Sequence, residues 1–168
     1  VIDAKSGTTG AGKKASEALL FSEVEGECLP YKVGVHQHLP EINLFAKKIA
    51  NTLMNPFFTT SLLATRRGIV AGLYANLKPG KTLKHVEEAY QEFYANYPLV
   101  KVKAQASLKQ VLGTAETHLS FHVVGEKLYL FSCLDNLLKG AASQAIENFN
   151  LIHGFSVVTG LDHLEAVL

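Results

Sequence analysis

The sequence has no tryptophan, one methionine and only two cysteines, Cys28 and Cys133. Two cysteines are too few for a disulfide framework, and they do not form a C-x-x-C pair. We therefore expect free thiols, a reducing compartment and a cytoplasmic protein. Cys133 lies in an apolar, strand-like run, and Cys28 follows Glu27, whose charge would raise the pKa of a thiol. Neither cysteine is expected to act as a nucleophile.

An excess of charge of one sign is also missing. The chain has 16 basic and 15 acidic residues, spread along its length, for a net charge of +1. No basic stripe is available to follow a phosphate backbone, which argues against nucleic-acid binding. No apolar run reaches the roughly 18–20 residues that cross a bilayer, so no membrane span is expected.

The length and the opening of the chain suggest its organisation. A chain of 168 residues, 48% of them hydrophobic, is about one domain with a sizeable core. Residues 1–5 contain neither an initiator methionine nor the start of a secretory signal, and they are typical of a strand already under way. We therefore expect an excised or processed part of a longer protein.

Hydrophobic periodicity predicts helices interspersed among mostly hairpin-like strands. Helices are expected over 14–22, from Pro40-Glu41, after a Thr82 cap, and from Asp135-Asn136 to about residue 151. Strands are expected over 1–4, 30–38, 57–63, 68–77, 100–103, 118–124 and 127–134. This order predicts an α+β fold with a mixed, largely antiparallel sheet and helices on one face.

The loop Ser6-Gly7-Thr8-Thr9-Gly10-Ala11-Gly12 is the first candidate site. Its glycines would let a ligand approach the backbone, and successive amides can cradle an anion. The spacing matches neither a P-loop nor a dinucleotide fingerprint. From its composition alone, the segment is better explained as an ordinary strand-to-helix loop.

His36 and His38 form the second candidate. On an extended segment, residues two apart point to the same side, so the pair could bind a metal or supply a general acid/base. No third ligand accompanies them at metal-like spacing, and no metal site is expected. Ordinary surface histidines remain an alternative.

Two further segments have functional and structural explanations. Arg66-Arg67 precedes a predicted strand, where paired guanidinium groups suit phosphate or carboxylate recognition but also occur at solvated corners. Residues 135–145 contain a helix cap and a Gly-Ala-Ala run, which would let a flat ring or another backbone approach closely.

Together, in this order, the segments resemble one family. Ile2-Asp-Ala-Lys-Ser-Gly-x-x-Gly-Ala-Gly12, Tyr31-Lys-Val-Gly-x-His-Gln-His38, Pro40-Glu-Ile42, Arg67-Gly-Ile69 and Asp135-Asn-Leu-Leu-Lys-Gly-Ala-Ala-x-Gln-Ala145 are similar to motifs of the N-acetyl-gamma-glutamyl-phosphate reductases. The resemblance covers essentially the whole chain. It implies a two-domain reductase in which a Rossmann domain holds NADP. Residues 1–168 would be the substrate-binding and dimerisation domain, similar to the catalytic domain of glyceraldehyde-3-phosphate dehydrogenase.

The resemblance also implies a reaction that belongs to arginine biosynthesis, and a mechanism for it. A cysteine thiolate attacks a small-molecule acyl phosphate, phosphate leaves, and NADPH reduces the thioester to a semialdehyde, aided by an acid/base histidine. The family's nucleophilic cysteine motif and its Rossmann glycine motif are absent from this sequence. The isolated chain is therefore expected to be inactive.

The resemblance assigns site residues one by one. His38 is the favoured acid/base, with His36 as the alternative; Ser6, Gly7 and Arg67 are expected to bind substrate. Residues near the cofactor would be Gly10, Ala11, Gly12, Asn136 and Gly140. The helix over 135–151 would pack toward the Rossmann domain, and the sheet would pair two or four copies into a homo-oligomer.

Two other functions stay open. One is a sister activity on an aspartyl or aminoadipyl acyl phosphate, because Thr60-Ser61 and Ala64-Thr65-Arg66 depart from the usual family residues. The other is a non-catalytic oligomerisation module.

Overall fold

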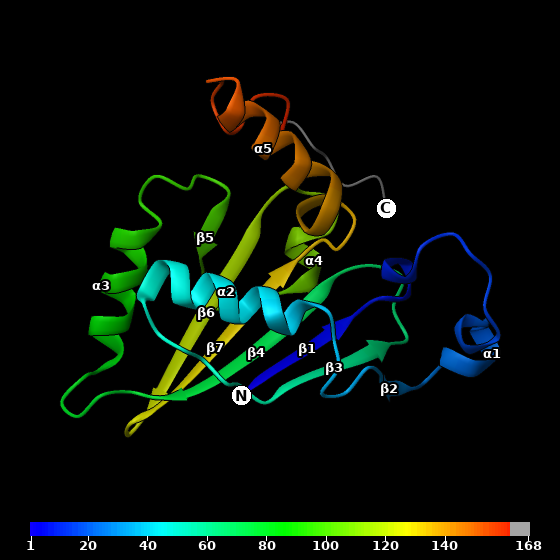
Figure 1. Cartoon of the computed structure of the whole chain (residues 1–168), viewed down its shortest axis with the longest axis horizontal. Helices are drawn as coiled ribbons and strands as arrows, with labels where there is room; N and C mark the ends of the chain where they lie inside the picture. The colour runs from blue at the N-terminus through cyan, green and yellow to red at the C-terminus, as the bar shows by residue number, and fades with distance from the viewer. Residues whose placement is uncertain (162–168) are drawn as a thin grey trace.

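A seven-stranded sheet forms the centre of the chain in the computed structural model, which describes residues 1–161. Its spatial order is β2-β3-β1-β4-β7-β6-β5 (Figure 1). Strands β1 and β3 pair in parallel, as do β5 and β6, and the other four pairs are antiparallel. The strands are β1 Ile2–Ser6, β2 Cys28–Pro30, β3 Phe58–Leu63, β4 Ile69–Asn76, β5 Val100–Val102, β6 Thr117–Val124 and β7 Lys127–Leu134. The predicted α+β class and largely antiparallel sheet are confirmed.

One face of the sheet carries the main core. Residues in register share a face, so an apolar row crosses five strands, consisting of Phe58, Ile2, Leu73, Leu130 and Phe121. Helix α3 (Leu83–Phe93) lies on this face, and its Val86 packs with Leu119, Phe121 and Leu130. Thr82 is its N-cap, as predicted, and the Thr82 amide donates to Nδ1 of His85 at 3.2 Å.

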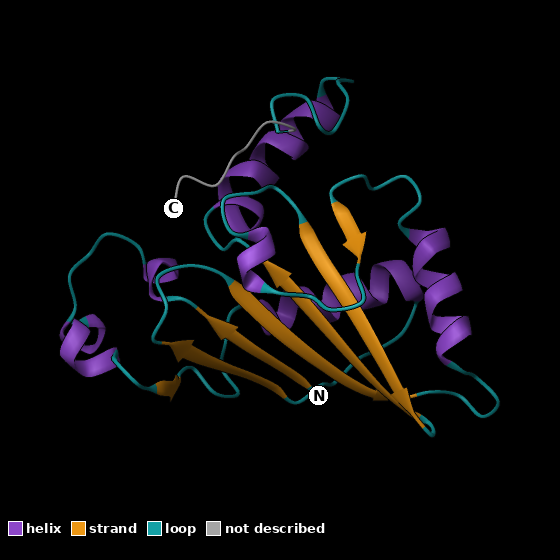
Figure 2. Ribbon diagram, turned by 180° about the vertical axis from the view of Figure 1, so that it is seen from behind, coloured by secondary structure: helices purple, strands orange, loops and turns teal. Residues whose placement is uncertain are grey.

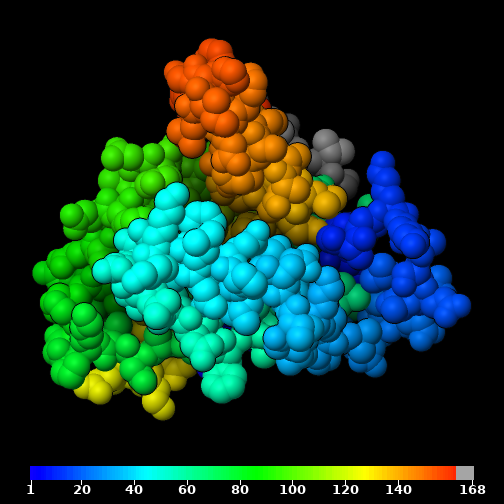
Figure 3. All heavy atoms as spheres, in the orientation of Figure 1, coloured from blue at the N-terminus to red at the C-terminus, as the bar shows by residue number. Residues whose placement is uncertain are grey.

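Helix α2 (His38–Ala50) crosses the same face but is poorly covered. It forms much of the outer surface between α3 and the N-terminal segment (Figure 3). No residue of α2 is buried; Phe45 and Ile49, expected on its apolar face, are 54% and 64% exposed. The apolar surface of this helix therefore has little to pack against among the described residues.

The opposite face is more open (Figure 2). The chain after β5 crosses it, and a hollow of about 430 Å³ lies between residues 104–106 and the strands. Helix α4 (Leu108–Val111), which the sequence did not predict, follows this segment. His122, which lines the hollow, is in register with Tyr129 of β7, and Tyr129 is in register with Tyr74 of β4. None of the predicted site residues lines the hollow.

Two predictions near the N-terminus are wrong. Residues 14–22 do not form a helix but two short turns, 3-10 at Glu17–Leu19 and α1 at Phe21–Val24. Residues 10–18 are exposed, so a helix there would have no apolar face to bury. Residues 31–38 are not extended, because Lys32 and Gly34 have positive φ angles of 46° and 73° and turn the chain into α2.

The C-terminal strands and helix agree with those predicted from the sequence. Strands β6 and β7 form the predicted hairpin, with Val124 paired to Lys127. After β7 the chain enters a π-helical turn, Leu138–Ala142, and then α5, Ser143–Ile152. The predicted helix therefore forms, but it begins three residues after Asp135.

Candidate functional site

Strand directions bring three loops together at one edge of the sheet. Ser6 at the end of β1 pairs with Ile69 at the start of β4, and Ile69 pairs with Leu134 at the end of β7. Consequently the loops after β1 and β7 meet the loop before β4. These loops contain most of the residues that the sequence predicted to bind substrate or cofactor.

Backbone contacts hold the loop after β1 against the loop before β4. The amide of Gly7 donates to the carbonyl of Gly68 at 2.8 Å, and the amide of Thr9 donates to the carbonyl of Arg66 at 3.1 Å. A Cβ atom on Gly7 would lie 2.8 Å from the Arg67 nitrogen and 2.9 Å from the Arg66 carbonyl. Only glycine therefore permits this approach, and Gly7 acts through its missing side chain.

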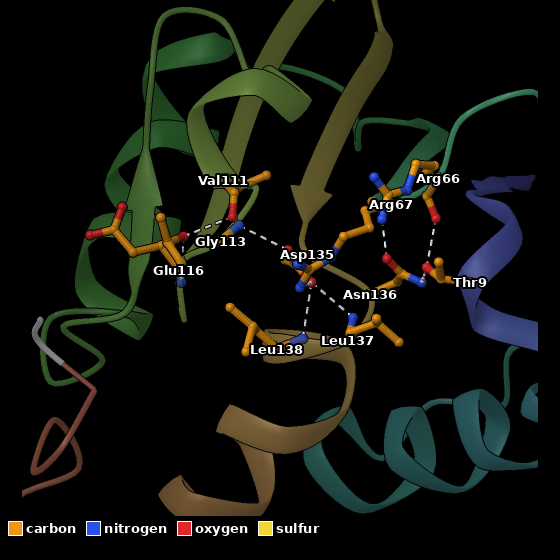
Figure 4. Close-up of polar contacts among 12 residues, drawn as sticks. Thr9, Arg66, Arg67, Val111, Gly113, Glu116, Asp135, Asn136, Leu137 and Leu138 are labelled. Atoms are coloured by element: carbon orange, nitrogen blue, oxygen red, sulfur yellow. Dashed lines mark hydrogen bonds and ion pairs between the residues drawn. The ribbon is translucent and has the colours of Figure 1, made fainter. Parts of the chain in front are cut away.

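Asp135 is the fully buried acceptor at the centre of this edge (Figure 4). Its carboxylate accepts hydrogen bonds from the amides of Gly113, Leu137 and Leu138 at 2.9, 2.9 and 3.0 Å. Nη2 of Arg67 also donates to it at 2.8 Å. Burial opposes its ionisation, but the three amides and Arg67 outweigh burial and hold its pKa below the ordinary value. Asp135 therefore carries a buried negative charge.

Arg67 lies between the buried Asp135 carboxylate and the protein surface. Its side chain is 30% exposed, and one of its nitrogens is committed to Asp135. Its Nε is buried and has no hydrogen-bond partner in the described chain. A guanidinium carries five N–H donors, so donors remain for an anionic ligand.

Asn136 ties the three loops together (Figure 4). Its Oδ1 accepts from the amide of Gly68 at 2.7 Å, and its Nδ2 donates to Oγ1 of Thr9 at 3.0 Å. A Cβ on Gly10 would lie 3.6 Å from that Nδ2 and 3.3 Å from Oγ of Ser6. The structure thus brings Ser6, Gly10 and Asn136 into one cluster.

The two histidines form a separate group against β3, near the β2 edge of the sheet. The ring of His36 is buried between Tyr31, Phe58 and His38, with centroid distances of 5.6, 5.4 and 4.8 Å. His38 is the first residue of α2, and its side chain is 59% exposed. No described hydrogen bond joins either histidine to the loop after β1.

Comparison with known proteins identifies the family. Residues 1–136 match the family described as semialdehyde dehydrogenase, dimerisation domain. The chain belongs to this family.

Similar curated proteins include two N-acetyl-gamma-glutamyl-phosphate reductases, which confirms the predicted resemblance. That of Staphylococcus epidermidis is 40% identical over 165 residues, and that of Streptococcus gordonii is 42% identical over 164. Each alignment covers 96% of this chain and 48% of the relative, so this semialdehyde dehydrogenase domain spans about half the length of the proteins it matches.

Solved structures share the fold. Aspartate semialdehyde dehydrogenase II of Vibrio cholerae superposes with a TM-score of 0.64 at 14% identity, covering 91% of this chain and 54% of that one. The enzyme from Francisella tularensis gives a TM-score of 0.59 at 19% identity, covering 77% and 40%. These matches support the semialdehyde dehydrogenase domain architecture.

Four of the five predicted cofactor residues of this semialdehyde dehydrogenase domain, all except Asn136, lie at its surface. Ala11, Gly12 and Gly140 are exposed, and nothing lies within 4 Å of a Cβ built on Gly12. This open backbone fits the edge of a bound ligand. Asn136 is instead buried and engaged by the loops, so it fits better as a support for that surface.

Sequence reasoning missed two members of the cluster. Asp135 and Thr9 were noted within their motifs but not as site residues, although both bind predicted site residues directly. For Asp135 the signal was a charged residue directly after the apolar run of β7, which ends at Leu134. Within residues 1–161, no group of three or more metal-ligating side chains is assembled, and no helix is long and apolar enough to cross a membrane.

Proposed function

We propose that this chain is the substrate-binding and subunit-pairing half of an NADP-dependent reductase of arginine biosynthesis. The full protein would convert N-acetyl-gamma-glutamyl phosphate to N-acetylglutamate semialdehyde and inorganic phosphate. The observation that carries the proposal is the 40–42% identity to curated reductases of that name over 96% of the chain. The site geometry supports a role in binding an anion and moving a proton.

Arg67 is the group that would bind the substrate's anion. Asp135 holds one end of its guanidinium in place, which lowers the entropy lost when the remaining donors engage a carboxylate or phosphate. Gly7 and Gly10 would let the substrate approach the backbone beside it. Ser6 lies next to Gly10 and could donate to the same ligand.

His38 would be the general acid/base. Its imidazole is exposed at the start of α2 and can exchange a proton with a bound ligand. In the reaction the bond from the acyl carbon to the phosphate oxygen breaks, and the carbonyl oxygen gains and loses a proton. His38 would hold that proton.

The nucleophilic thiolate would come from outside this chain. Cys133 is 2% exposed in β7, and burial raises the pKa of its thiol, which opposes formation of the thiolate. Cys28 is exposed on edge strand β2, where it pairs with Leu63, and β3 separates it from β1 and the loop after β1. A bound NADPH would supply the hydride, with Gly10, Ala11, Gly12 and Gly140 as the surface beside it.

Two surfaces of the domain would contact other parts of the assembly. The apolar side chains of α5 and the following turn would pack toward the NADP-binding half; they include Ile146, Phe149, Ile152 and Phe155, all more than 40% exposed. The open sheet face, where Tyr74 makes edge contacts with Tyr129 and Phe131, would pair with a second copy. The family's description as a dimerisation domain supports this pairing.

The test is phosphate-dependent reduction of NADP with N-acetylglutamate semialdehyde, run on this chain and on the full gene product. We expect turnover by the full product and none by the chain alone. Replacing Arg67 by Met in the full product should raise KM for the semialdehyde or phosphate by about tenfold or more, since a charged hydrogen bond contributes about 1.5–3 kcal/mol. Turnover by the chain alone would contradict the proposal.

The same assay with aspartate semialdehyde distinguishes the proposed activity from the sister activity on an aspartyl phosphate. A higher kcat/KM on that substrate would favour an aspartyl enzyme, and silence on every semialdehyde would favour a structural module. The cytoplasmic location stays a prediction, which fractionation of cells that express the full product would test.

A further inference from the structure

His36 and His38 occupy different environments although they are only two residues apart. His36 is 7% exposed and enclosed by aromatic rings, whereas the side chain of His38 is 59% exposed. The backbone turns between them, and α2 begins at His38. The two side chains therefore cannot have interchangeable roles.

The first turn of α2 is capped by His36. Nδ1 of His36 accepts the backbone N–H of His38 at 3.2 Å, and the carbonyl of His36 accepts the N–H of Leu39 at 3.0 Å. Gln37, the residue before the helix, makes no side-chain cap. The free amides at a helix start need such partners, and the His36 imidazole satisfies one of them.

This hydrogen bond also fixes the chemical state of His36. A ring nitrogen that accepts from an amide is unprotonated, so the ring is neutral with its proton on Nε2. Burial lowers the pKa of His36, and the charges of His38 and Lys32 lower it further, which agrees with a neutral ring. Nδ1 is therefore not available to take up a proton without breaking the cap.

The ring of His36 also restricts His38 directly. The two ring centroids lie 4.8 Å apart at an interplanar angle of 62°, an edge-on packing. The position of His36 is itself fixed by its edge contacts with Tyr31 and Phe58. Tyr31 is bound to the sheet, because its amide donates to the carbonyl of Thr60 and Oγ1 of Thr60 donates to the carbonyl of Tyr31.

We propose that His36 is a positioning residue, which caps α2 and orients the acid/base His38 from a fixed point on the sheet. This inference rests on the proposed function, and it assigns the two histidines of one motif to separate tasks. It means that catalysis requires an acceptor and a flat ring at position 36, but no proton transfer there.

Three replacements of His36 and one of His38, made in the full gene product, separate these tasks. His36→Asn keeps an acceptor atom on Cγ, where Nδ1 stands, but loses the ring. His36→Phe keeps a flat ring and loses the acceptor, and His36→Ala loses both. His38→Gln removes the proposed acid/base and leaves the cap intact.

The expected order follows from the separate tasks. His38→Gln should lower kcat by about 10²–10⁴-fold, the contribution of a general acid/base. His36→Phe and His36→Ala should lower kcat by about 10–100-fold through misplacement, with KM for the semialdehyde little changed. His36→Asn should recover a large part of the loss seen with Phe. The pH dependence of kcat should keep its inflection in every His36 variant and lose it in His38→Gln.

Either of two results would overturn the proposal. One is a loss in His36→Asn as large as in His38→Gln, with the inflection also gone, because His36 would then transfer the proton. The other is full activity in His36→Phe, since the cap would then be irrelevant. Circular dichroism melting of each variant shows whether the fold is retained, and the Asn variant keeps the test valid if Phe or Ala does not fold.

A readout independent of turnover separates this inference from the proposed function. Long-range ¹⁵N spectra of the histidine rings in this chain should show His36 neutral at neutral pH, with the proton on Nε2. If the full product turns over no semialdehyde but the spectra agree, the proposed function fails and the cap stands. A His36 ring protonated on Nδ1 would overturn the cap itself.

Discussion

Nη2 of Arg67 donates to Oδ1 of the fully buried Asp135 at 2.8 Å, so the arginine expected to bind substrate is anchored by a charge beneath it. The same carboxylate receives the amides of three residues in two other loops. Binding geometry and fold stability therefore depend on one side chain.

Replacement of Asp135 should cost substantial stability. Asp135→Ala leaves the Arg67 charge and three amides without their acceptor, so we expect the free energy of unfolding to fall by about 3–5 kcal/mol. Asp135→Asn, which keeps one acceptor oxygen, should lose less. Urea denaturation of the chain measures both. Lys84→Ala, which breaks the exposed pair with Glu88, is the control and should change stability by less than about 0.5 kcal/mol.

The stability should depend on pH through His36. Because burial lowers its pKa below the ordinary value of 6.5, the unfolded chain binds a proton more readily than the folded chain. The stabilising contribution is thus complete above pH 6.5 and is lost as the pH falls through the folded pKa. Urea midpoints measured from pH 7.5 to pH 5 should decrease, and His36→Asn should flatten the decrease. An equal decrease in the variant would assign it to other groups.

Gly7 should not tolerate a side chain, for a steric reason. Its φ angle is −67°, which any residue can adopt, but a Cβ would meet backbone atoms of Arg66 and Arg67 within 2.9 Å. Gly7→Ala should therefore destabilise the chain by about 1–3 kcal/mol. Gly140→Ala is the matched control, since its Cβ would meet nothing closer than 3.5 Å. Thermal melting of both variants tests the difference, and equal melting temperatures would contradict it.

The two thiols should differ in reactivity. Cys28 is exposed, whereas Cys133 is 2% exposed and has a pKa raised by burial. An aromatic disulfide reagent at pH 8 should modify Cys28 rapidly and Cys133 only as the chain unfolds. Cys28→Ser should remove the fast phase and leave the slow one. Two fast phases in the native chain would show that β7 opens readily.

Local sequence patterns were sufficient for most of the sheet and for three of the helices. The hairpin of β6 and β7 and the cap at Thr82 depend on neighbours in the chain, and both were predicted correctly. The helix over 14–22 and the strand over 30–38 failed for a different reason. A segment with a helical or alternating pattern forms a helix or strand only where its apolar face is covered by other parts of the protein. The positive φ angle of Lys32, which ends the extended segment, cannot be predicted from a hydrophobic pattern.

By itself, the sequence determined the family, the α+β class and the residue types of the site, because these depend on order and spacing along the chain. Only the tertiary structure decided that Arg67 is bound to Asp135, residues 68 positions apart, and that His36 is buried while His38 is exposed. Those relationships depend on strand register and on the turn before α2, which bring distant side chains together through contacts that spacing alone does not specify.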